Sequence, residues 1–505
     1  MKTAILSSHQ MKLAENKVCT GKTTSFLLMQ RAGKAIADAL TARYAKQPVL
    51  VLCGSGNNGG DGFIAAAALS KKKWPVTVAC AVDPHDLQGD ASRAAGGWSG
   101  EVIPFDEVEL PEEGLIIDAV FGTGLARPVT GAIGDLLMSL RESECPVIAV
   151  DVPSGLYADT GECQPCTPQA ELTVTFFRKK PAHILYPGKM ACGEVIVADI
   201  GIEEDVLDDL GPFIHENDPS LEWGALCEDK PAYAHKYDHG HVVILGGKAM
   251  TGAASLVSVA ALRMGAGLST IVTSAEVANV YRALCPSVIV ETYPDMARFK
   301  EHIKDPRRNV VVLGPGAGFE HPAALKKAVF DSVQSEDDKT CVLDADALTV
   351  FADDPKILHK VLGENCVLTP HEGEFARIFP DITGSKIERA YEAARRTGAV
   401  IVLKGPDTVI AAPHDRLVIN ATGSGWLATA GSGDVLAGMI AGLAARNIMS
   451  PFDAACAAVW MHGKAAEKLG AGMISADLPE VLPVIWRIMP RAPQDGEPEE
   501  LPATE

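Results

Sequence analysis

Apolar runs of strand length alternate with amphipathic runs of helical length along most of the chain. This alternation is typical of α/β proteins built on parallel sheets. In the first half it predicts a helix over residues 25–42, with Leu28, Ile36 and Leu40 on its apolar face, and a second helix over 61–73. Strands are predicted over 48–53, 75–82, 115–121, 147–152, 171–177 and 194–200.

The alternation stops over residues 203–232, which are acidic, contain three prolines and show no sustained period. We interpret this segment as the boundary between two α/β domains, 1–215 and 225–490. In the second domain the pattern predicts a helix over 251–265 and strands over 241–247, 268–273, 309–314, 340–345, 366–370, 399–405 and 416–420. Residues 491–505 are rich in proline and acidic side chains and predict a disordered acidic tail.

Composition excludes several classes of partner. The 505 residues carry a formal net charge of −20, which disfavours binding to nucleic acid or to an anionic membrane. The uncharged apolar run at 435–445 is too short to cross a bilayer. The 12 cysteines are scattered, and Cys163 and Cys166 form a C-x-x-C pair with no second pair at zinc spacing, so we expect free thiols and a cytoplasmic location. The expected partners are small molecules and further copies of the chain, as a homo-oligomer.

A glycine-rich segment over residues 54–62 follows the first strand of the first domain. Glycine lets a ligand approach the backbone, and the start of the following helix favours anions. Gly54, Gly56 and Gly59 match G-x-G-x-x-G, and Asp83 ends the next strand, as in a nicotinamide dehydrogenase. This reading is disfavoured because no second substrate site for hydride transfer emerges.

Polar residues also mark the ends of two further strands in this domain. Asp118 precedes a loop over 122–128, and Asp151 leads into Pro153 and Ser154. Helix caps and turns would explain each alone. Because the carboxyl ends of strands border the ligand crevice of an open α/β sheet, their repetition predicts a binding site there.

The strings NNGGDG, DAVFGTGLARP and DVPSG, with LMQRAG upstream, resemble the NAD(P)H-hydrate epimerase domain over about residues 1–215. The resemblance implies a Rossmann-like doubly wound sheet, a potassium ion on Asn58, Asp118 and Ser154, and inversion at the hydrated ring carbon. Asp151 is the candidate acid/base, for which we expect a raised pKa at a desolvated strand end. Glu15 stands where the family often has Asp. The implied substrate contacts are Asn57, Asn58, Gly59, Gly60, Asp61, Gly122, Thr123, Gly124, Leu125, Ala126, Arg127, Pro128 and Asp151.

In the second domain, a glycine-rich turn over 430–433 precedes Asp434 and a predicted helix. Backbone amides at such a helix start can bind a transferring phosphoryl group, and an aspartate there can accept the proton of an attacking hydroxyl. A glycine turn with an Asp cap is the structural alternative. His371 taken singly also fits a capping role, and Lys404 follows a strand, where it can face phosphates.

The strings GGKAMTGAASL, GPGAG, DADAL, LTPHEGE and NATGSGWLATAGSGDVLAG resemble the NAD(P)H-hydrate dehydratase branch of the ribokinase-like fold, over about residues 230–490. The resemblance implies an α/β/α domain, Asp434 as the base, ADP as phosphoryl donor and co-substrate, and Mg²⁺ with the nucleotide. It implies hydrate contacts at Ala253, Gly316, His371 and Asp434, and nucleotide contacts at Lys404, Gly405, Pro406, Asp407, Thr408 and Gly433.

Together the two resemblances imply a bifunctional repair enzyme. It would epimerise the R and S forms of hydrated NADH and NADPH and dehydrate the S form, with ADP converted to AMP and phosphate. Two alternatives stay open on the residues alone. The second domain fits a ribokinase-type small-molecule kinase equally well, and the first fits a noncatalytic nucleotide-binding scaffold.

Overall fold

The computed structural model describes residues 2–19, 23–225, 227, 233–335, 337 and 339–489. The chain divides into two compact units, residues 1–214 and 215–505, which we describe separately. The predicted tail at 491–505 lies outside the described residues. Within the described part of the chain, no helix is long and apolar enough to span a bilayer.

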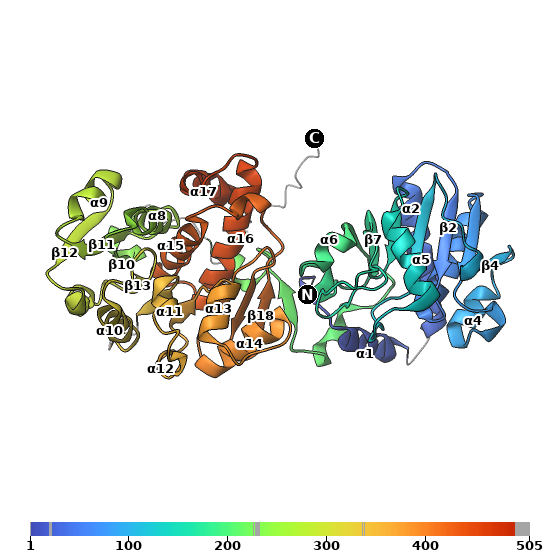
Figure 1. Ribbon diagram of the computed structural model, residues 1–505, viewed down its shortest axis with the longest axis horizontal. Helices are drawn as coiled ribbons and strands as arrows, with labels where there is room; N and C mark the ends of the chain where they lie inside the picture. Colours follow the sequence, from blue (N-terminus) through green and yellow to red (C-terminus); the bar gives the residue numbers. More distant parts are fainter. Residues whose placement is uncertain are drawn as a thin grey trace. The chain divides into compact units, whose positions relative to one another are not determined.

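The first unit is built on a seven-stranded parallel sheet with the strand order β4-β3-β2-β5-β6-β7-β8 (Figure 1). The chain runs outward from β2 to β4 and then returns to the other side of β2, so the order reverses between β2 and β5. Such a switch point opens a crevice at the carboxyl ends of the strands. The strands of this sheet are β2 (Val49–Cys53), β3 (Val76–Cys80), β4 (Val102–Pro104), β5 (Leu115–Ala119), β6 (Val147–Val150), β7 (Leu172–Phe176) and β8 (Glu194–Ala198), and the short strand β1 (Ala4–Ile5) lies outside it.

Helices cover both faces of this sheet because its strands are apolar on both faces. Val49 and Val51 of β2 pack in one cluster with α2 and α3, and Leu50 and Leu52 pack in another with α5. This alternation follows from the two-residue period of a strand. The helices are α1 (Ser8–Val18), α2 (Ser25–Arg43), α3 (Asn57–Lys71), α4 (Gly89–Ala95), α5 (Gly131–Glu142) and α6 (Gly188–Cys192).

The second unit holds a larger sheet in the order β18-β17-β16-β15-β14-β13-β10-β11-β12, with β9 (Ile214–Glu216) beside β18. Strands β10 to β16 are parallel, and β16, β17 and β18 form an antiparallel meander. The order reverses between β10 and β13, which is a second switch point. The strands are β10 (His241–Leu245), β11 (Leu268–Ser274), β12 (Ile289–Tyr293), β13 (Val310–Leu313), β14 (Thr340–Leu343), β15 (Cys366–Leu368), β16 (Val400–Leu403), β17 (Val409–Ala412) and β18 (Arg416–Ile419).

Small residues allow the helices of one face to pack closely against each other. A Cβ atom at Gly438 of α15 would lie 2.3 Å from the carbonyl oxygen of Val257 in α8. The main apolar cluster joins these helices to α16 and α17 (Figure 1). The helices of the unit are α7 (Glu222–Ala225), α8 (Thr251–Arg263), α9 (Ala278–Leu284), α10 (Pro322–Val333), α11 (Asp346–Thr349), α12 (Pro355–His359), α13 (Glu372–Ile378), α14 (Lys386–Thr397), α15 (Ser432–Ala445), α16 (Pro451–Leu469) and α17 (Leu478–Arg487).

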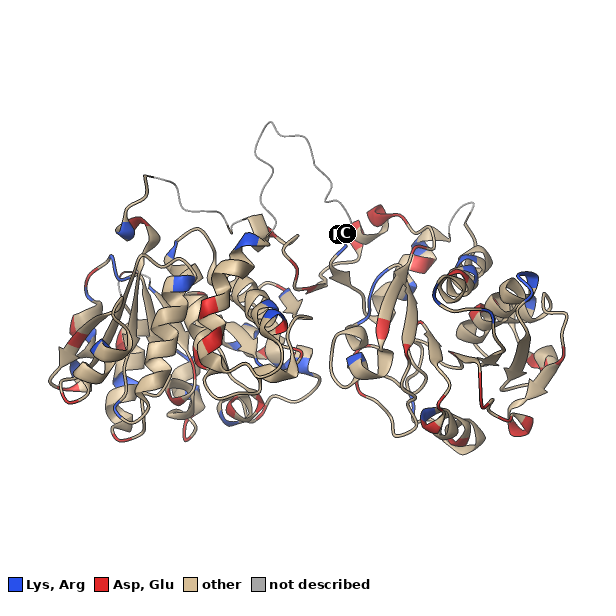
Figure 2. Ribbon diagram, turned by 90° about the horizontal axis from the view of Figure 1, so that it is seen from above, with Lys and Arg blue, Asp and Glu red and all other residues tan. Residues whose placement is uncertain are grey.

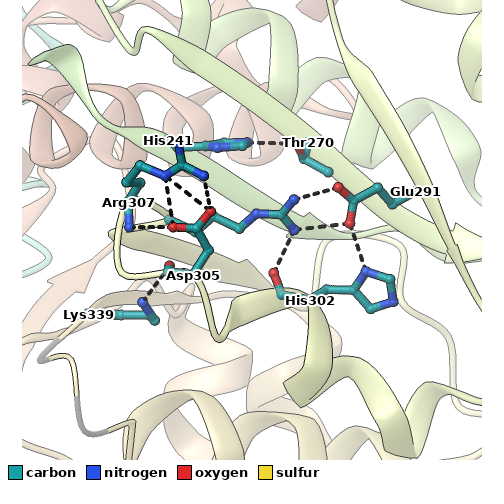
Figure 3. A network of polar contacts seen from close by, with 8 residues as sticks. His241, Thr270, Glu291, His302, Asp305, Arg307 and Lys339 are labelled. Carbon is teal, nitrogen blue, oxygen red and sulfur yellow. Dashed lines mark hydrogen bonds and ion pairs between the residues drawn. The ribbon is translucent and has the colours of Figure 1, made fainter. Parts of the chain in front are cut away.

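Charged residues are interspersed over the ribbon of both units (Figure 2). Around Glu291 of β12 they form a defined network (Figure 3). Glu291 accepts hydrogen bonds from Arg308 at 2.5 and 3.0 Å and lies 2.8 Å from His302 Nδ1. Nearby, Asp305 pairs with Arg307 at 2.7 Å. These residues tie the loop after η6 (Met296–Ile303) to the edge strand of the sheet.

The predicted α/β fold class is confirmed in both units. The helix predicted from residue 61 begins instead at Asn57. Its first turn contains Gly59 and Gly60. A side chain would not fit at Gly59, because a Cβ atom there would lie 1.9 Å from the carbonyl oxygen of Gly54. Strands β4, β12 and β17 were not predicted, and the short, partly exposed β4 and β12 lack an apolar run.

Candidate functional site

In the first unit, the predicted site residues come together at the carboxyl ends of β2, β5 and β6. Residues 57–61 form the first turn of α3, whose N-cap is Gly56. A Cβ atom at Gly122, in the loop after β5, would lie 2.8 Å from Asn58 Oδ1. The glycine-rich turn and the 122–128 loop therefore meet at the switch point.

Asp118 and Ser154 form a buried hydrogen-bonded pair beside this junction. Ser154 donates to the Asp118 carboxylate from its backbone N at 2.7 Å and from its hydroxyl at 2.5 Å. Ser154 Oγ also accepts the Phe121 N–H at 2.8 Å. Burial raises the pKa of Asp118, although the hydrogen bonds from Ser154 lower it in part. Nδ2 of Asn58 is buried and has no hydrogen-bond partner among the described residues.

Asp151 follows β6 and is held by a cation that the sequence analysis did not identify. Lys180 Nζ donates to Asp151 Oδ1 at 2.6 Å, and Thr175 Oγ1 donates to the same oxygen at 2.7 Å. The Lys180 side chain is fully buried. Burial acts to raise the pKa of Asp151, but Lys180 and Thr175 together bring it below its ordinary value. The expectation of a raised pKa at this residue is therefore wrong.

His183 fixes the backbone that carries this pair. Its Nδ1 accepts the N–H of Lys180 at 2.9 Å, so the proton lies on Nε2, which donates to the carbonyl oxygen of Asp151 at 2.8 Å. Burial and the Lys180 charge lower the pKa of His183 to about 4, so the ring is neutral at pH 7. Asp151 itself has a φ of 64°, in the left-handed region that non-glycine residues rarely adopt.

Two further carboxyl groups face the same pair. Burial raises the pKa of Asp61 well above its ordinary value, and the charges of Asp151 and Glu15 raise it further. Burial also raises the pKa of Glu15, opposed by Lys180. The first unit therefore brings three acids near one buried lysine, and burial favours the protonated forms of Asp61 and Glu15. The 122–128 loop is largely exposed beside them.

In the second unit, Asp434 lies in the first turn of α15, after Gly431 with a φ of 89°. Lys404, after β16, donates to Asp344 Oδ1 at 2.8 Å, and Asp344 follows β14. Burial and the Asp344 charge raise the pKa of Asp434 to about 6, although Lys404 lowers it in part. These three side chains form one buried charged cluster at the amino end of the helix.

His371 and Glu374 form the N-terminal cap of α13 at the rim of this cluster. His371 Nδ1 accepts from the backbone N of Gly373 at 3.0 Å, and Glu374 accepts from the His371 N–H at 2.9 Å. Glu374 Oε2 lies 3.9 Å from Lys404 Nζ. More than half of the His371 side chain is exposed. His371 thus caps the helix, and its imidazole is also exposed enough to contact a ligand.

The loop after β13 brings Gly316 beside Ala253. Gly316 has a φ of 62°, and a Cβ atom there would lie 3.0 Å from the Cβ of Ala253. Two residues later, Gly318 donates its N–H to Asp346 at 2.8 Å. Asp346 also acts electrostatically on Asp434. The predicted hydrate contacts Gly316 and Ala253 therefore lie beside a loop that reaches the cluster of Asp434, Lys404 and Asp344.

The residues of the turn over 404–408 make two kinds of contact. Lys404 points to Asp344, whereas Thr408 closes the turn by donating to the Gly405 carbonyl oxygen at 2.9 Å. The Asp407 side chain is buried against Lys386. Gly433 is close to this turn, because a Cβ atom there would lie 3.4 Å from Lys404 Nζ. Among the described residues, no group of three or more His, Cys, Asp or Glu is placed to hold a metal ion.

Sequence reasoning missed Lys180, Thr175 and His183. The signal was available, because a pair of lysines directly follows the apolar strand β7, where a cation reaches the carboxyl edge. It also missed the pairing of Lys404 with Asp344, which joins residues 60 apart in the sequence.

Both halves of the chain match known protein families. A model described as NAD(P)H-hydrate dehydratase matches residues 241–483, and one described as the YjeF-related protein N-terminus matches residues 25–182. A bifunctional NAD(P)H-hydrate repair enzyme of Moorella thermoacetica is 34% identical, with 92% of each chain covered. The one from Escherichia coli is 34% identical over 90% of this chain and 88% of its own.

Among solved structures, the ADP/ATP-dependent NAD(P)H-hydrate dehydratase of Bacillus subtilis, co-crystallised with ATP and Mg²⁺, is 28% identical to this chain. It covers 55% of this chain and 99% of its own length, with a TM-score of 0.46. The two matched regions and the relatives that span nearly the whole length lead to one conclusion: the chain belongs to the family of bifunctional NAD(P)H-hydrate repair enzymes.

Proposed function

We propose that the first unit epimerises hydrated NADH and NADPH and that the second dehydrates the S epimer at the expense of a nucleotide. The observation that carries the proposal is that each unit holds a carboxylate next to a lysine beside the carboxyl ends of its parallel strands: Asp151 with Lys180, and Asp434 with the Lys404–Asp344 pair. Each pair can exchange a proton with a bound hydroxyl group. Water adds to the dihydronicotinamide ring from either face, so both activities are needed to recover all of it.

For the epimerase, Asp151 is the proposed group that accepts a proton from the water returning to the hydrated ring carbon. Its lowered pKa makes it a carboxylate at neutral pH, ready to accept a proton. The 2.6 Å hydrogen bond to Lys180 supplies a proton donor to the same position. Inversion needs removal of the hydroxyl group and its return to the opposite face, so a donor and an acceptor within one hydrogen bond suit the reaction.

A potassium ion is proposed on Asn58, Asp118 and Ser154. The residues can offer oxygen atoms: the carboxylate of Asp118, the hydroxyl of Ser154 that is hydrogen-bonded to it at 2.5 Å, and Oδ1 of Asn58, which lies beside Gly122 in the loop after β5. Oxygen donors of this kind suit a hard cation. When bound, the ion would supply positive charge near the nucleotide phosphates. The chain's own contribution is to hold the 122–128 loop against the start of α3, where the phosphate contacts are proposed.

For the dehydratase, Asp434 is the proposed base. It removes the proton of the hydrate hydroxyl, whose oxygen takes the terminal phosphoryl group of the nucleotide. Phosphate then leaves with the C–O bonding electrons as the ring loses a proton and regains its double bond. The amides at the start of α15 lie where the transferred group develops charge. A carboxyl pKa near 6 leaves Asp434 mostly ionised at pH 7 while keeping it basic enough to accept the proton.

The nucleotide is proposed to bind along residues 404–408 and Gly433, with ADP as the donor and Mg²⁺ on its phosphates. The tight turn closed by Thr408 and the bare backbone of Gly433 support this placement. Twelve free cysteines support the proposed cytoplasmic location. The homo-oligomer stays a prediction that light scattering of the purified protein would check.

The experiment is recovery of dihydronicotinamide absorbance from an equal mixture of hydrate epimers with K⁺, Mg²⁺ and either ADP or ATP. Full recovery with ADP, together with AMP and free phosphate, is expected. Recovery that stops at about half contradicts the epimerase, since only one epimer is then consumed. A stable phosphorylated product in place of restored absorbance contradicts the dehydratase and identifies a kinase.

A further inference from the structure

A cavity of about 280 Å³ lies at the carboxyl ends of β10, β11 and β12. Gly247 after β10 and Tyr293 at the end of β12 line it, and the loop over residues 317–321 after β13 closes its other side. It therefore borders the switch point between β10 and β13, where open α/β sheets bind ligands. Its volume is at the small end for ligand sites, which suits part of a dinucleotide.

The cavity and the Asp434 cluster share one loop. Gly318 lines the cavity and donates its N–H to Asp346, which acts electrostatically on Asp434. Gly316, in the same loop, lies beside Ala253. A hydrate bound at Gly316 and Ala253 can therefore extend into the cavity. The nucleotide donor is proposed next to β16, on the other side of β13, so it does not compete for this space.

The lining suits an adenosine group. Tyr293 and Met296 are buried, and Phe319 at the rim is 49% exposed, so its ring offers a face for stacking a base. Ser274 also lines the cavity, and its buried Oγ has no hydrogen-bond partner among the residues that the structure describes. An unpaired buried hydroxyl is costly unless a ligand completes its hydrogen bond.

The charges at the cavity disfavour an additional phosphate. Lys248 is engaged by Glu276 at 3.0 Å and lies near Glu320. Asp295 and Glu320 also line the cavity, so carboxylates outnumber the one lysine. A ribose hydroxyl can donate to these groups, whereas a 2′-phosphate would be repelled.

We propose that this cavity binds the adenosine half of the hydrated dinucleotide, and that Asp295 and Glu320 make hydrated NADH a better dehydratase substrate than hydrated NADPH. The proposal rests on the proposed dehydratase function. It assigns specificity to residues outside the reacting cluster.

The test compares kcat/KM of the full-length protein for the S epimers of hydrated NADH and hydrated NADPH, with saturating nucleotide and Mg²⁺. Hydrated NADH is expected to be favoured by at least about fivefold at low ionic strength, with a smaller ratio at high salt. The double variant Asp295→Asn, Glu320→Gln should raise kcat/KM for hydrated NADPH by about fivefold and leave hydrated NADH within about twofold. Asparagine retains the cap that Asp295 provides to the Ala297 N–H.

A matched control is Glu364→Gln, which removes one negative charge just before β15 and outside the cavity. It should leave the ratio unchanged. Phe319→Ala should lower kcat/KM for both hydrates by about tenfold, through loss of stacking. Equal rates for both hydrates in the unaltered protein, or a ratio that the double variant does not change, overturn the inference alone. Turnover of neither hydrate by folded protein overturns the proposed dehydratase and the inference with it.

Discussion

At the residue scale, each unit contains an aspartate whose pKa its neighbours shift, and the two shifts have opposite directions. The Lys180 ammonium overcomes burial at Asp151 and lowers its pKa. At Asp434, burial and Asp344 overcome Lys404 and raise the pKa to about 6. The two groups therefore titrate over different ranges, and the two activities should respond differently to acid.

The dehydratase should lose activity below about pH 6, because Asp434 must be ionised to act as a base. Asp344→Asn removes a negative charge and should move this acidic limb to lower pH. Lys404→Gln removes the compensating charge and should move it to higher pH. The pH dependence of kcat/KM for the hydrate tests both signs. Shifts in the same direction for the two variants would contradict Asp434 as the titrating group.

Lys180→Met should reduce epimerisation by roughly 10²–10⁴-fold, the usual range for a lost acid/base partner. Without the ammonium, the Thr175 hydrogen bond opposes burial less strongly than the two groups do together, so the pKa of Asp151 rises. Any residual activity should then require a higher pH. Dehydration of purified S epimer by the same protein is the internal control and should stay unchanged. Equal loss of both activities would indicate misfolding instead.

At the element scale, the start of α3 shows why sequence patterns predicted a glycine-rich turn but not its geometry. The polar and glycine residues at 54–62 correctly predicted a strand-to-helix turn. They did not predict that residues 57–60 are helical, because this depends on contact with Gly54 and Met29 from other segments. Likewise, alternation predicted β7, whereas the Lys180–Asp151 contact depends on the pairing of β6 with β7.

Close packing at this turn gives a test with a matched control. Gly59→Ala should destabilise the first unit by about 1–3 kcal/mol, the usual cost of overpacking, because the added methyl group meets the Gly54 carbonyl oxygen. Gly56→Ala has open space and should cost less than about 1 kcal/mol. Denaturant unfolding of both variants measures the difference. Similar values would show that the turn relaxes around the new atom.

The network around Glu291 predicts a pH-dependent contribution to stability. Hydrogen bonds from Arg308 lower the pKa of Glu291 to about 2. A carboxylate with a depressed folded-state pKa stabilises the fold above its unfolded value, near 4.5, and loses this contribution as the pH falls toward 2. Glu291→Gln should therefore cost roughly 1–3 kcal/mol at pH 7 and little at pH 2. The control is Glu301→Gln, which removes the carboxylate of an exposed ion pair with Arg298. This variant should lose less stability at pH 7 than Glu291→Gln.

At the scale of the whole molecule, the two units have separate sheets, cores and proposed ligands. In the sequence, the interruption of the alternation between two α/β series predicts two domains. Each ligand should therefore raise the thermal stability of only the unit that binds it. In a thermal unfolding experiment, ADP with Mg²⁺ should raise the transition of the second unit, and K⁺ in place of a bulky organic cation should raise that of the first. Gly59→Ala identifies the first transition. Equal shifts of both transitions by either ligand would contradict the assignments.

The second unit carries its ion-pair network on β12 and the loop before β13, and its proposed reacting groups after β14 and β16 and at the start of α15. A change in a loop at the carboxyl ends alters what is bound, whereas the network ties the edge strand to a neighbouring loop. Tolerance to mutation should therefore differ between these two places. New substrate preferences can arise at residues such as Phe319 and Glu320 without loss of folding, so this end of the sheet is where variation among related chains has room to accumulate.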